Sequence, residues 1–196
     1  MMKKFWIIAI FITMTISAKS QTPDSTALIL IDIQYFYFPG GDMELSEPEK
    51  AAEKAKQLLD FFREKKALVV HVRHEHNPGG DIYKLVAPLE SEKVFSKKEV
   101  NSFLGTGLEE YLKQNHIKKL VLCGMQTHMC LEGATRAAHD LGYECTVIKD
   151  ACTTRDLIFD DVLTPAKQVH YSTLATLRNY AKILSLQEFL ESQNKK

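Results

Sequence analysis

Short apolar runs alternate with longer amphipathic segments along most of this chain. The runs at residues 27–33 (ALILIDI) and 67–72 (ALVVHV) are almost continuous, as expected for strands covered on both faces. Between them, Ala52, Leu59 and Phe62 recur at helical spacing. Strands separated by helices need right-handed crossovers and therefore form a parallel sheet. This alternation predicts an α/β fold with helices on both faces of the sheet.

The same pattern continues to the end of the chain. Short apolar runs predict further strands at residues 93–96, 120–123, 145–148 and 183–184. Helical spacing predicts helices at residues 108–114, 131–141, 164–181 and from 185 onward. Two signals mark helix ends, because residues 46–49 (SEPE) fit a capping box and Gly142 is a typical C-terminal stop.

Length and charge limit the possible functions. The 196 residues fit one domain that is large enough to bury a core. With 25 basic and 25 acidic residues the formal net charge is zero, so electrostatics give no reason to expect a nucleic acid partner. Four cysteines are too few for a disulfide framework. We expect them to be unpaired, although adjacent strands leave one Cys123–Cys145 bridge open.

Residues 1–20 have the pattern of a secretory signal peptide. Two lysines precede a mostly apolar run at residues 5–16, and small residues lead up to a predicted cleavage after Ser20. The run is shorter than the ~20 residues that a membrane-spanning helix needs, which makes an uncleaved anchor the weaker alternative. We therefore expect residues 21–196 to form the mature domain, exported to a periplasm or out of the cell, without stable membrane insertion.

Reactive side chains occur at the ends of three predicted strands. They are Asp32 in the first run, Lys97 or Lys98 after the third, and Cys130 in the helix after the fourth. Ligands of open parallel sheets bind beyond the carboxyl ends of the strands, so these residues are candidates for one site. The simpler alternatives are a capping aspartate, surface lysines and a small buried cysteine.

These residue types form a complete set for nucleophilic catalysis. Thr127 is predicted to cap the helix and to put Cys130 in its first turn, where free N–H groups and the helix dipole lower the pKa of a thiol. Asp32 would act as base for the thiol and then as acid for a leaving amine. A lysine cation would stabilise both charged groups. Spacing alone does not decide between Lys97 and Lys98.

Four segments resemble the isochorismatase-like cysteine hydrolases, which include nicotinamidases, N-carbamoylsarcosine amidases and isochorismatases. In order, these segments read ALILIDIQ, KKEVNSFLGT, CGMQTHMC and RAAHDLGYECTVIKDACTTRDL, and the likeness runs from about residue 27 to about residue 189. The resemblance implies a three-layer Rossmann-like fold with a six-stranded, mostly parallel sheet. It also implies a homodimer or a larger homo-oligomer.

The resemblance assigns roles to residues of this chain. It implies Asp32 as general base, Cys130 as nucleophile and Lys97 as the third member of the triad, since the family pattern K-x-x-x-(S/N)-(A/S)-F fits from Lys97 onward. It further implies a cis peptide bond between Met125 and Gln126, and an oxyanion hole formed by the backbone N–H groups of Gln126 and Cys130. The implied reaction is hydrolysis of a C–N bond in a small amide-type substrate through a cysteine thioester.

A substrate pocket is expected to include Gln34, Phe36, Phe38 and His128. The aromatic run at residues 35–38 would either line an apolar pocket or pack under a loop, and the sequence does not decide between the two. Many relatives have Asn-Asp where this run begins, so the identity of the substrate stays open.

We expect no metal and no other cofactor. His74 and His76 form a His-x-His pair after the second predicted strand, but such a pair alone is a weak signal for a metal site. Three alternative functions stay open: a metal-assisted nicotinamidase, a vinyl ether hydrolase of the isochorismatase type, and a catalytically silent exported binding protein of the same fold.

Overall fold

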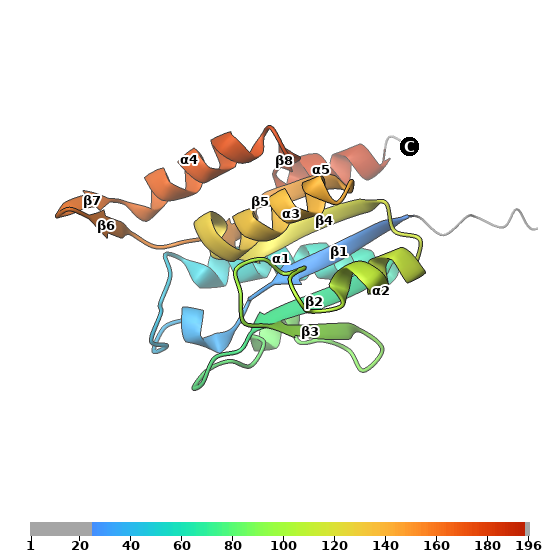
Figure 1. The fold of residues 1–196 in the computed structure, drawn as a ribbon, viewed down its shortest axis with the longest axis horizontal. Helices are drawn as coiled ribbons and strands as arrows, with labels where there is room; N and C mark the ends of the chain where they lie inside the picture. Colours follow the sequence, from blue (N-terminus) through green and yellow to red (C-terminus); the bar gives the residue numbers. More distant parts are fainter. Residues whose placement is uncertain (1–24, 195–196) are drawn as a thin grey trace, which may run out of the picture.

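A six-stranded sheet forms the centre of the protein, for which a computed structural model describes residues 25–194 (Figure 1). The strand order is β3-β2-β1-β4-β5-β8, and every neighbouring pair is parallel. The predicted fold class and sheet are therefore confirmed. The strands are β1 (Thr26–Ile31), β2 (Leu68–His74), β3 (Lys93–Lys97), β4 (Lys119–Met125), β5 (Glu144–Thr153) and β8 (Ala181–Leu184).

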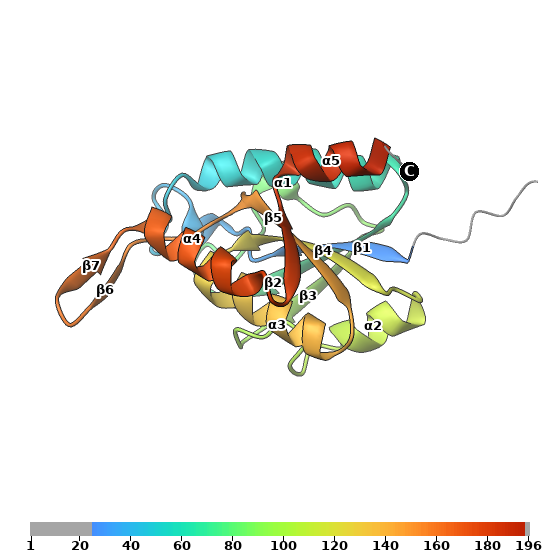
Figure 2. The ribbon, with the colours of Figure 1, turned by 90° about the horizontal axis from the view of Figure 1, so that it is seen from above.

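Helices cover both faces of the sheet, as Figure 2 shows. Helices α1 and α5 lie on one face, whereas α2 and α3 lie on the other with α4 packed beside α3. The apolar residues of α1 that recur at helical spacing are buried, which explains why this segment is helical and where it packs. The helices are α1 (Pro48–Glu64), α2 (Leu108–Gln114), α3 (Glu132–Asp140), α4 (Ala166–Leu177) and α5 (Leu186–Asn194), with shorter turns η1 (Tyr35–Tyr37), η2 (Lys84–Val86) and η3 (Thr127–Leu131).

The predicted capping box at the start of α1 is wrong. The residue before the helix is Glu47, which has a left-handed φ of 49° and makes no side-chain cap, while its carboxylate pairs with Lys50. Ser46 is held elsewhere, because its N–H donates to the carbonyl of Thr154 at 2.8 Å. At α5 the expected start is confirmed: the N–H of Ser185 donates to Oε2 of Glu188 at 2.6 Å, and the N–H of Glu188 donates to Oγ of Ser185 at 3.2 Å.

A small antiparallel hairpin supplies the two strands of the described residues that the apolar pattern did not predict. Its strands are β6 (Leu157–Phe159) and β7 (Val162–Thr164), so α4 begins at Ala166 rather than at Thr164 as predicted. The hairpin projects from the body beside the start of α4 (Figures 1 and 2). Three residues per strand are too few for the periodicity of a strand to be visible in the sequence.

Gly124 brings the ends of β1 and β4 into close contact. A side chain at this position would place its Cβ 2.0 Å from the carbonyl oxygen of Ile31, and the backbone φ is +128°, which favours glycine. Ile31 and Gly124 are register partners in the β1–β4 pair. The residues that follow both strands, including Asp32, therefore start from adjacent points on one edge of the sheet.

The predicted signal peptide at residues 1–20 lies outside the described residues. Within residues 25–194, no helix is both long and apolar enough to cross a membrane.

Candidate active site

The three triad candidates meet at the carboxyl edge of the sheet. Asp32 directly follows β1, Lys97 is the last residue of β3, and Cys130 lies in η3 just after β4. Their exposed fractions are 0%, 2% and 5%. Because β1 is flanked by β2 and β4, with β3 beyond β2, the parallel register carries all three side chains to the same end.

The Lys97 ammonium is the centre of this cluster. Its Nζ atom lies 2.7 Å from Oδ2 of Asp32, 3.1 Å from Sγ of Cys130 and 3.2 Å from Nδ1 of His74. An ammonium has three protons to donate, and three acceptors surround it here. Lys98, by contrast, is exposed and lies 3.8 Å from Glu75, so the structure places Lys97 rather than Lys98 in the cluster.

Burial opposes charge on both the acid and the thiol. It raises the pKa of Asp32 above its ordinary value, although Lys97 acts in the opposite direction. Burial also raises the pKa of Cys130 to about 12, the charge of Asp32 adds to the increase, and Lys97 again opposes it. The thiol is therefore protonated near neutral pH. Moving its proton to Asp32 shifts one negative charge between two atoms that both contact Lys97.

His74 is a member of the cluster that sequence reasoning placed elsewhere, as a weak metal candidate. It pairs with Lys97 in the register of β2 and β3, which brings the two side chains together. Burial and the Lys97 charge lower the pKa of His74, so its neutral ring accepts from the ammonium. His76 does not join it, because His76 contacts the Asp42 carboxylate at 3.0 Å and packs on Phe36.

A metal ion bound between these side chains would have to occupy the position of the Lys97 ammonium. The candidate ligand atoms of Asp32, His74 and Cys130 lie within 4.8 Å of one another, which is close enough for a shared ion. The Lys97 ammonium contacts all three residues, however, and it already supplies the positive charge. These residues fit a buried ammonium better than a metal ion.

The segment before Cys130 differs from the predicted cap. The Met125–Gln126 peptide bond is cis, the geometry that the resemblance implies. The residue that precedes the helical turn η3 is Gln126, and no side chain caps the turn. Thr127, the predicted cap, instead donates from Oγ1 to the carbonyl of Thr153 at 3.0 Å and contacts Nδ1 of His170. Thr127 thus joins the turn to the end of β5.

Two buried polar groups without a partner lie just after strands β4 and β5. Nε2 of Gln126 donates to the hydroxyl of Tyr37 at 3.4 Å, but its Oε1 atom is buried without a partner among the described residues. Nε of Arg155, just beyond the end of β5, is likewise buried and unpartnered there. Burial raises the pKa of Tyr37, and the positive charge of Arg155 opposes this weakly, whereas burial lowers the pKa of His128 and the charge of Arg155 adds to that decrease. Sequence reasoning missed Arg155 because nothing in its spacing marks it.

Other predicted pocket residues are mainly engaged with the protein itself. The amide of Gln34 donates to the carbonyls of His74 and Gly80 and accepts from the N–H of His74. Phe36 and Phe38 are buried, and Phe38 stacks on Tyr83 at a centroid distance of 3.6 Å. The aromatic run therefore packs under a loop.

His128 is half-buried, and its Nδ1 atom contacts Oγ1 of Thr154 at 2.5 Å. The four cysteines are buried and free, as expected, and the Cys123–Cys145 bridge is not formed.

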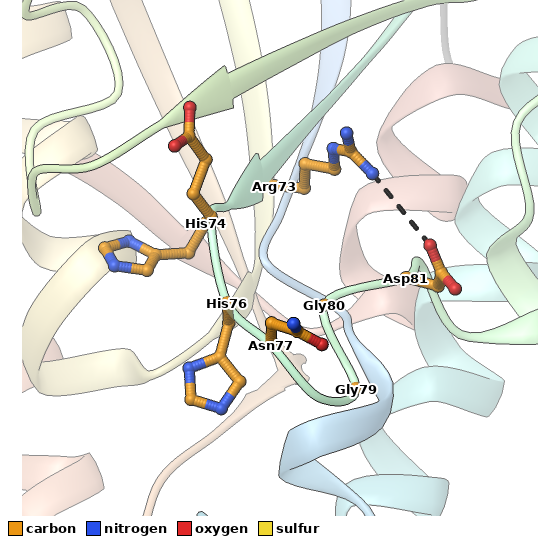
Figure 3. A pocket seen from close by; sticks show the side chains of 8 residues that line it. Arg73, His74, His76, Asn77, Gly79, Gly80 and Asp81 are labelled. Carbon is orange, nitrogen blue, oxygen red and sulfur yellow. Dashed lines mark ion pairs between the residues drawn. The ribbon is translucent and has the colours of Figure 1, made fainter.

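A cavity of about 470 Å³ borders the cluster. It is lined by residues 73–74 at the end of β2 and by residues 75–77 and 79–81 of the loop that follows. Figure 3 shows His74 and His76 projecting to one side of this loop, while Arg73 reaches toward Asp81 on the other side. His74 lines the cavity and also contacts Lys97, so the cavity lies against the triad cluster.

Comparison with known proteins shows likeness over most of the chain. The family model of the isochorismatase domain matches residues 26–186. The isochorismatase family protein YddQ of Bacillus subtilis is 42% identical over 179 residues, which cover 85% of this chain and 99% of YddQ. Streptothricin hydrolase of Streptomyces noursei is 29% identical over 140 residues, which cover 67% of this chain and 50% of that protein. The crystal structure of an isochorismatase hydrolase from Oleispira antarctica has a TM-score of 0.83 at 43% identity, covering 87% of this chain and 98% of that one.

Proposed function

Because the chain belongs to the isochorismatase family of hydrolases, we propose that it hydrolyses a C–N bond of a small amide-type molecule with Cys130 as nucleophile. The observation that carries this proposal is the Lys97 ammonium, which lies 2.7 Å from Asp32 and 3.1 Å from the Cys130 sulfur. A carboxylate and a thiol that share one buried cation form an acid–base pair with a nucleophile.

The first half of the reaction forms a thioester. Asp32 takes the proton of the Cys130 thiol, and Lys97 stabilises the new thiolate in place of the carboxylate. The sulfur attacks the carbonyl carbon, and the oxyanion accepts from the backbone N–H groups of Gln126 and Cys130. Asp32 then gives its proton to the nitrogen as the C–N bond breaks, which releases an amine or ammonia.

The second half returns the enzyme to its starting state. Water attacks the thioester carbon while Asp32 takes a proton from it. The C–S bond breaks, the carboxylic acid leaves, and the proton on Asp32 returns to the Cys130 sulfur. Lys97 keeps its charge throughout, since the negative charge only moves between the two groups that it contacts.

The unpartnered side-chain groups of Gln126 and Arg155 favour a polar substrate. Oε1 of Gln126 accepts from an N–H group, as an amide nitrogen would supply, and Nε of Arg155 donates to a carbonyl or carboxylate oxygen. A buried polar group without a partner costs about 1–3 kcal/mol, which a substrate that satisfies both groups would recover. The likeness to streptothricin hydrolase supports a hydrolase of this general kind.

We propose that the reaction uses the ammonium of Lys97 in place of a metal. All three candidate metal ligands contact this lysine, so binding of an ion would require Lys97 to leave a position in which it is fully paired. A hydrolase of this type keeps its activity in the presence of a chelator, whereas a metal-assisted nicotinamidase loses it.

The experiment that tests the function measures ammonia release from a panel of small amides, including nicotinamide. We expect turnover of at least one amide, and a loss of about a thousandfold or more in the Lys97→Met variant. Lys98→Met is the matched control, since Lys98 is the adjacent exposed lysine, and it keeps full activity. Equal effects of the two substitutions would contradict the proposed triad.

A catalytically silent protein would release no ammonia. It would also lack a cysteine whose alkylation is slowed by a ligand.

A further inference from the structure

Tyr37 buries a hydroxyl group near the segments that carry Asp32 and Cys130. It is the last residue of the turn η1, which follows β1 and Asp32, and only 4% of it is exposed. The hydroxyl oxygen accepts from Nε2 of Gln126 at 3.4 Å. Gln126 directly precedes η3, the turn that contains Cys130. The hydroxyl of Tyr37 therefore joins the segment that follows β1 to the segment that follows β4.

The proton of this hydroxyl has no acceptor within residues 25–194. A phenol hydroxyl can accept hydrogen bonds and can donate one. Its oxygen accepts from Gln126, but the described part of the chain offers no atom to which the hydroxyl donates. A buried donor that stays unpaired costs free energy, which a bound molecule recovers if it supplies the acceptor. The Tyr37 hydroxyl is therefore a donor that suits a ligand.

The surroundings of Tyr37 keep the hydroxyl protonated. Burial raises the pKa of Tyr37, the hydrogen bond from Gln126 opposes this increase, and the charges of Asp32 and Cys130 add to it. The phenol thus lies within electrostatic range of both reacting groups. In the proposed reaction the negative charge moves between Asp32 and Cys130, so it favours the protonated phenol at each stage. Tyr37 remains a donor throughout and takes no part in the proton transfers.

The hydroxyl is held in place by the backbone and the ring of Tyr37. The N–H of Tyr37 donates to the carbonyl of Gln34 at 3.1 Å, and its carbonyl accepts from the N–H of Leu45 at 3.1 Å. Its ring packs on that of Phe36 at a centroid distance of 4.1 Å. A donor that is fixed before binding loses little entropy when its partner arrives. Such a donor discriminates strongly against a ligand that lacks the acceptor.

We propose that Tyr37 is a specificity-determining residue, which donates a hydrogen bond to an acceptor atom of the substrate close to the carbonyl group that Cys130 attacks. This inference rests on the proposed function, since it takes the substrate to react at Cys130. It adds a substrate class, namely small amides with an oxygen acceptor on the first or second carbon beyond the scissile carbonyl. A purely hydrocarbon acyl group leaves the Tyr37 proton unpaired and makes a poor substrate.

Two matched pairs of amides test the proposal with the purified full-length protein. Lactamide is compared with isobutyramide, and 3-hydroxypropanamide with butanamide, because the members of each pair differ only in a hydroxyl that replaces a methyl group. We expect the unchanged protein to prefer the hydroxy amide of at least one pair by about tenfold or more in kcat/KM. An unchanged protein without a preference in either pair would overturn the proposal.

The variant Tyr37→Phe keeps the ring and removes the hydroxyl. We expect it to lose the preference, because kcat/KM falls about tenfold for the hydroxy amide and stays within about twofold for the hydrocarbon amide. Tyr35→Phe is the matched control, since Tyr35 is the exposed tyrosine of the same turn, and it keeps the preference. If Tyr37 only supported the fold, Tyr37→Phe would lower kcat/KM for both amides by the same factor. That result would also overturn the proposal.

Protection of Cys130 against alkylation by iodoacetamide gives a measurement that needs no turnover. We expect the hydroxy amide to protect at a concentration about tenfold lower than the hydrocarbon amide in the unchanged protein, and at a similar concentration in Tyr37→Phe. If protection shows this difference and no amide releases ammonia, the proposed hydrolysis fails while the role of Tyr37 stands. Equal protection by the two amides of each pair in the unchanged protein contradicts the role of Tyr37.

Discussion

His71 and His74, three residues apart on strand β2, lie in two different buried charge clusters. Side chains an odd number of residues apart on a strand point to opposite faces of the sheet. Nε2 of His71 contacts the Glu92 carboxylate at 2.9 Å, and Glu92 also accepts from Nε and Nη2 of Arg63. His74 instead contacts Lys97, together with Asp32 and Cys130.

The two clusters differ in how their acid is held. The pKa of Glu92 falls to about 2, because hydrogen bonds from Arg63, the N–H of Leu89 and His71 outweigh the effect of burial. The pKa of Asp32 rises, because burial outweighs Lys97. Glu92 is thus fixed as a carboxylate, whereas Asp32 is set to exchange a proton with the Cys130 thiol. The difference separates a cluster that stabilises the fold from one that can carry out chemistry.

The largest expected effect is that of removing the sulfur. Cys130→Ala is expected to lower the turnover of any accepted amide by about ten-thousandfold or more, because no other side chain can form the thioester. Its unfolding free energy stays close to that of the unchanged chain. Cys145→Ala is the matched control, since Cys145 is buried but lies away from Asp32 and Lys97, and it keeps its activity. Retained activity in Cys130→Ala, measured by ammonia release, would rule out the mechanism.

The next largest effect is that of replacing Asp32, which is expected to change both the turnover and the pKa of the Cys130 thiol. Asp32→Asn is expected to reduce turnover by about a thousandfold, because the base and acid are lost. The same change lowers the pKa of Cys130 below its value of about 12, since the Asp32 charge helps to raise it while Lys97 still lowers it. The pH dependence of alkylation measures this pKa. A slower enzyme with an unchanged or higher thiol pKa would show that Asp32 does not interact with the sulfur as proposed.

Replacing the acid of the Glu92 cluster by its amide is expected to lower the stability of the fold without affecting catalysis. Glu92→Gln leaves Arg63 and His71 without their carboxylate, which costs about 2–3 kcal/mol of unfolding free energy, reduced by the partial exposure of Arg63. Denaturant unfolding measures the loss. Turnover under conditions where the variant is folded stays within about twofold, because the Glu92 cluster does not contact the triad. A large loss of turnover in the folded variant would show that the two clusters are coupled.

The sequence was sufficient to locate the reactive edge, but not the contacts that define it. Asp32 and Cys130 could be identified because each follows an apolar run, and the ends of parallel strands meet at one edge. Choosing Lys97 over Lys98 needed the family pattern. The position of His74 beside Lys97 follows from the register of β2 and β3, which depends on how the residues between positions 74 and 97 fold. No local pattern carries that information.

Helix ends and the β6–β7 hairpin were less predictable for a related reason. Ser46 has the right spacing for a capping box, but its N–H bonds to Thr154, a residue that is distant in sequence. Thr127 is likewise held by the end of β5 and not by its own helix. The apolar residues of the β6–β7 hairpin are exposed in a single chain. A prediction that takes apolar residues to be buried therefore does not identify these strands. In each case a long-range contact, or its absence within the described chain, overrides the local signal.

The smallest expected effect is a pH dependence of stability that comes from the Glu92 cluster. Burial lowers the pKa of His71 in the folded protein, although Glu92 opposes this. The unfolded chain therefore binds a proton at higher pH than the folded one, and the folded state loses stability as the pH falls from about 7.5 to about 5. Glu92, with a pKa of about 2, stays ionised over this range and adds no slope. Burial lowers the pKa of His74, His128 and His170 too, so the total slope has the same sign.

The contribution of His71 is separated from the others by substitution. His71→Gln removes the titrating ring. Denaturant unfolding at several pH values between about 7.5 and about 5 is expected to show an unfolding free energy that changes less with pH, by up to about 1.4 kcal/mol per pH unit. An unaltered slope in His71→Gln would mean that the ring is already charged in the folded protein. The Glu92 cluster would then resemble the triad, with a proton shared between its members, and the distinction between a fixed and an exchangeable acid would no longer hold.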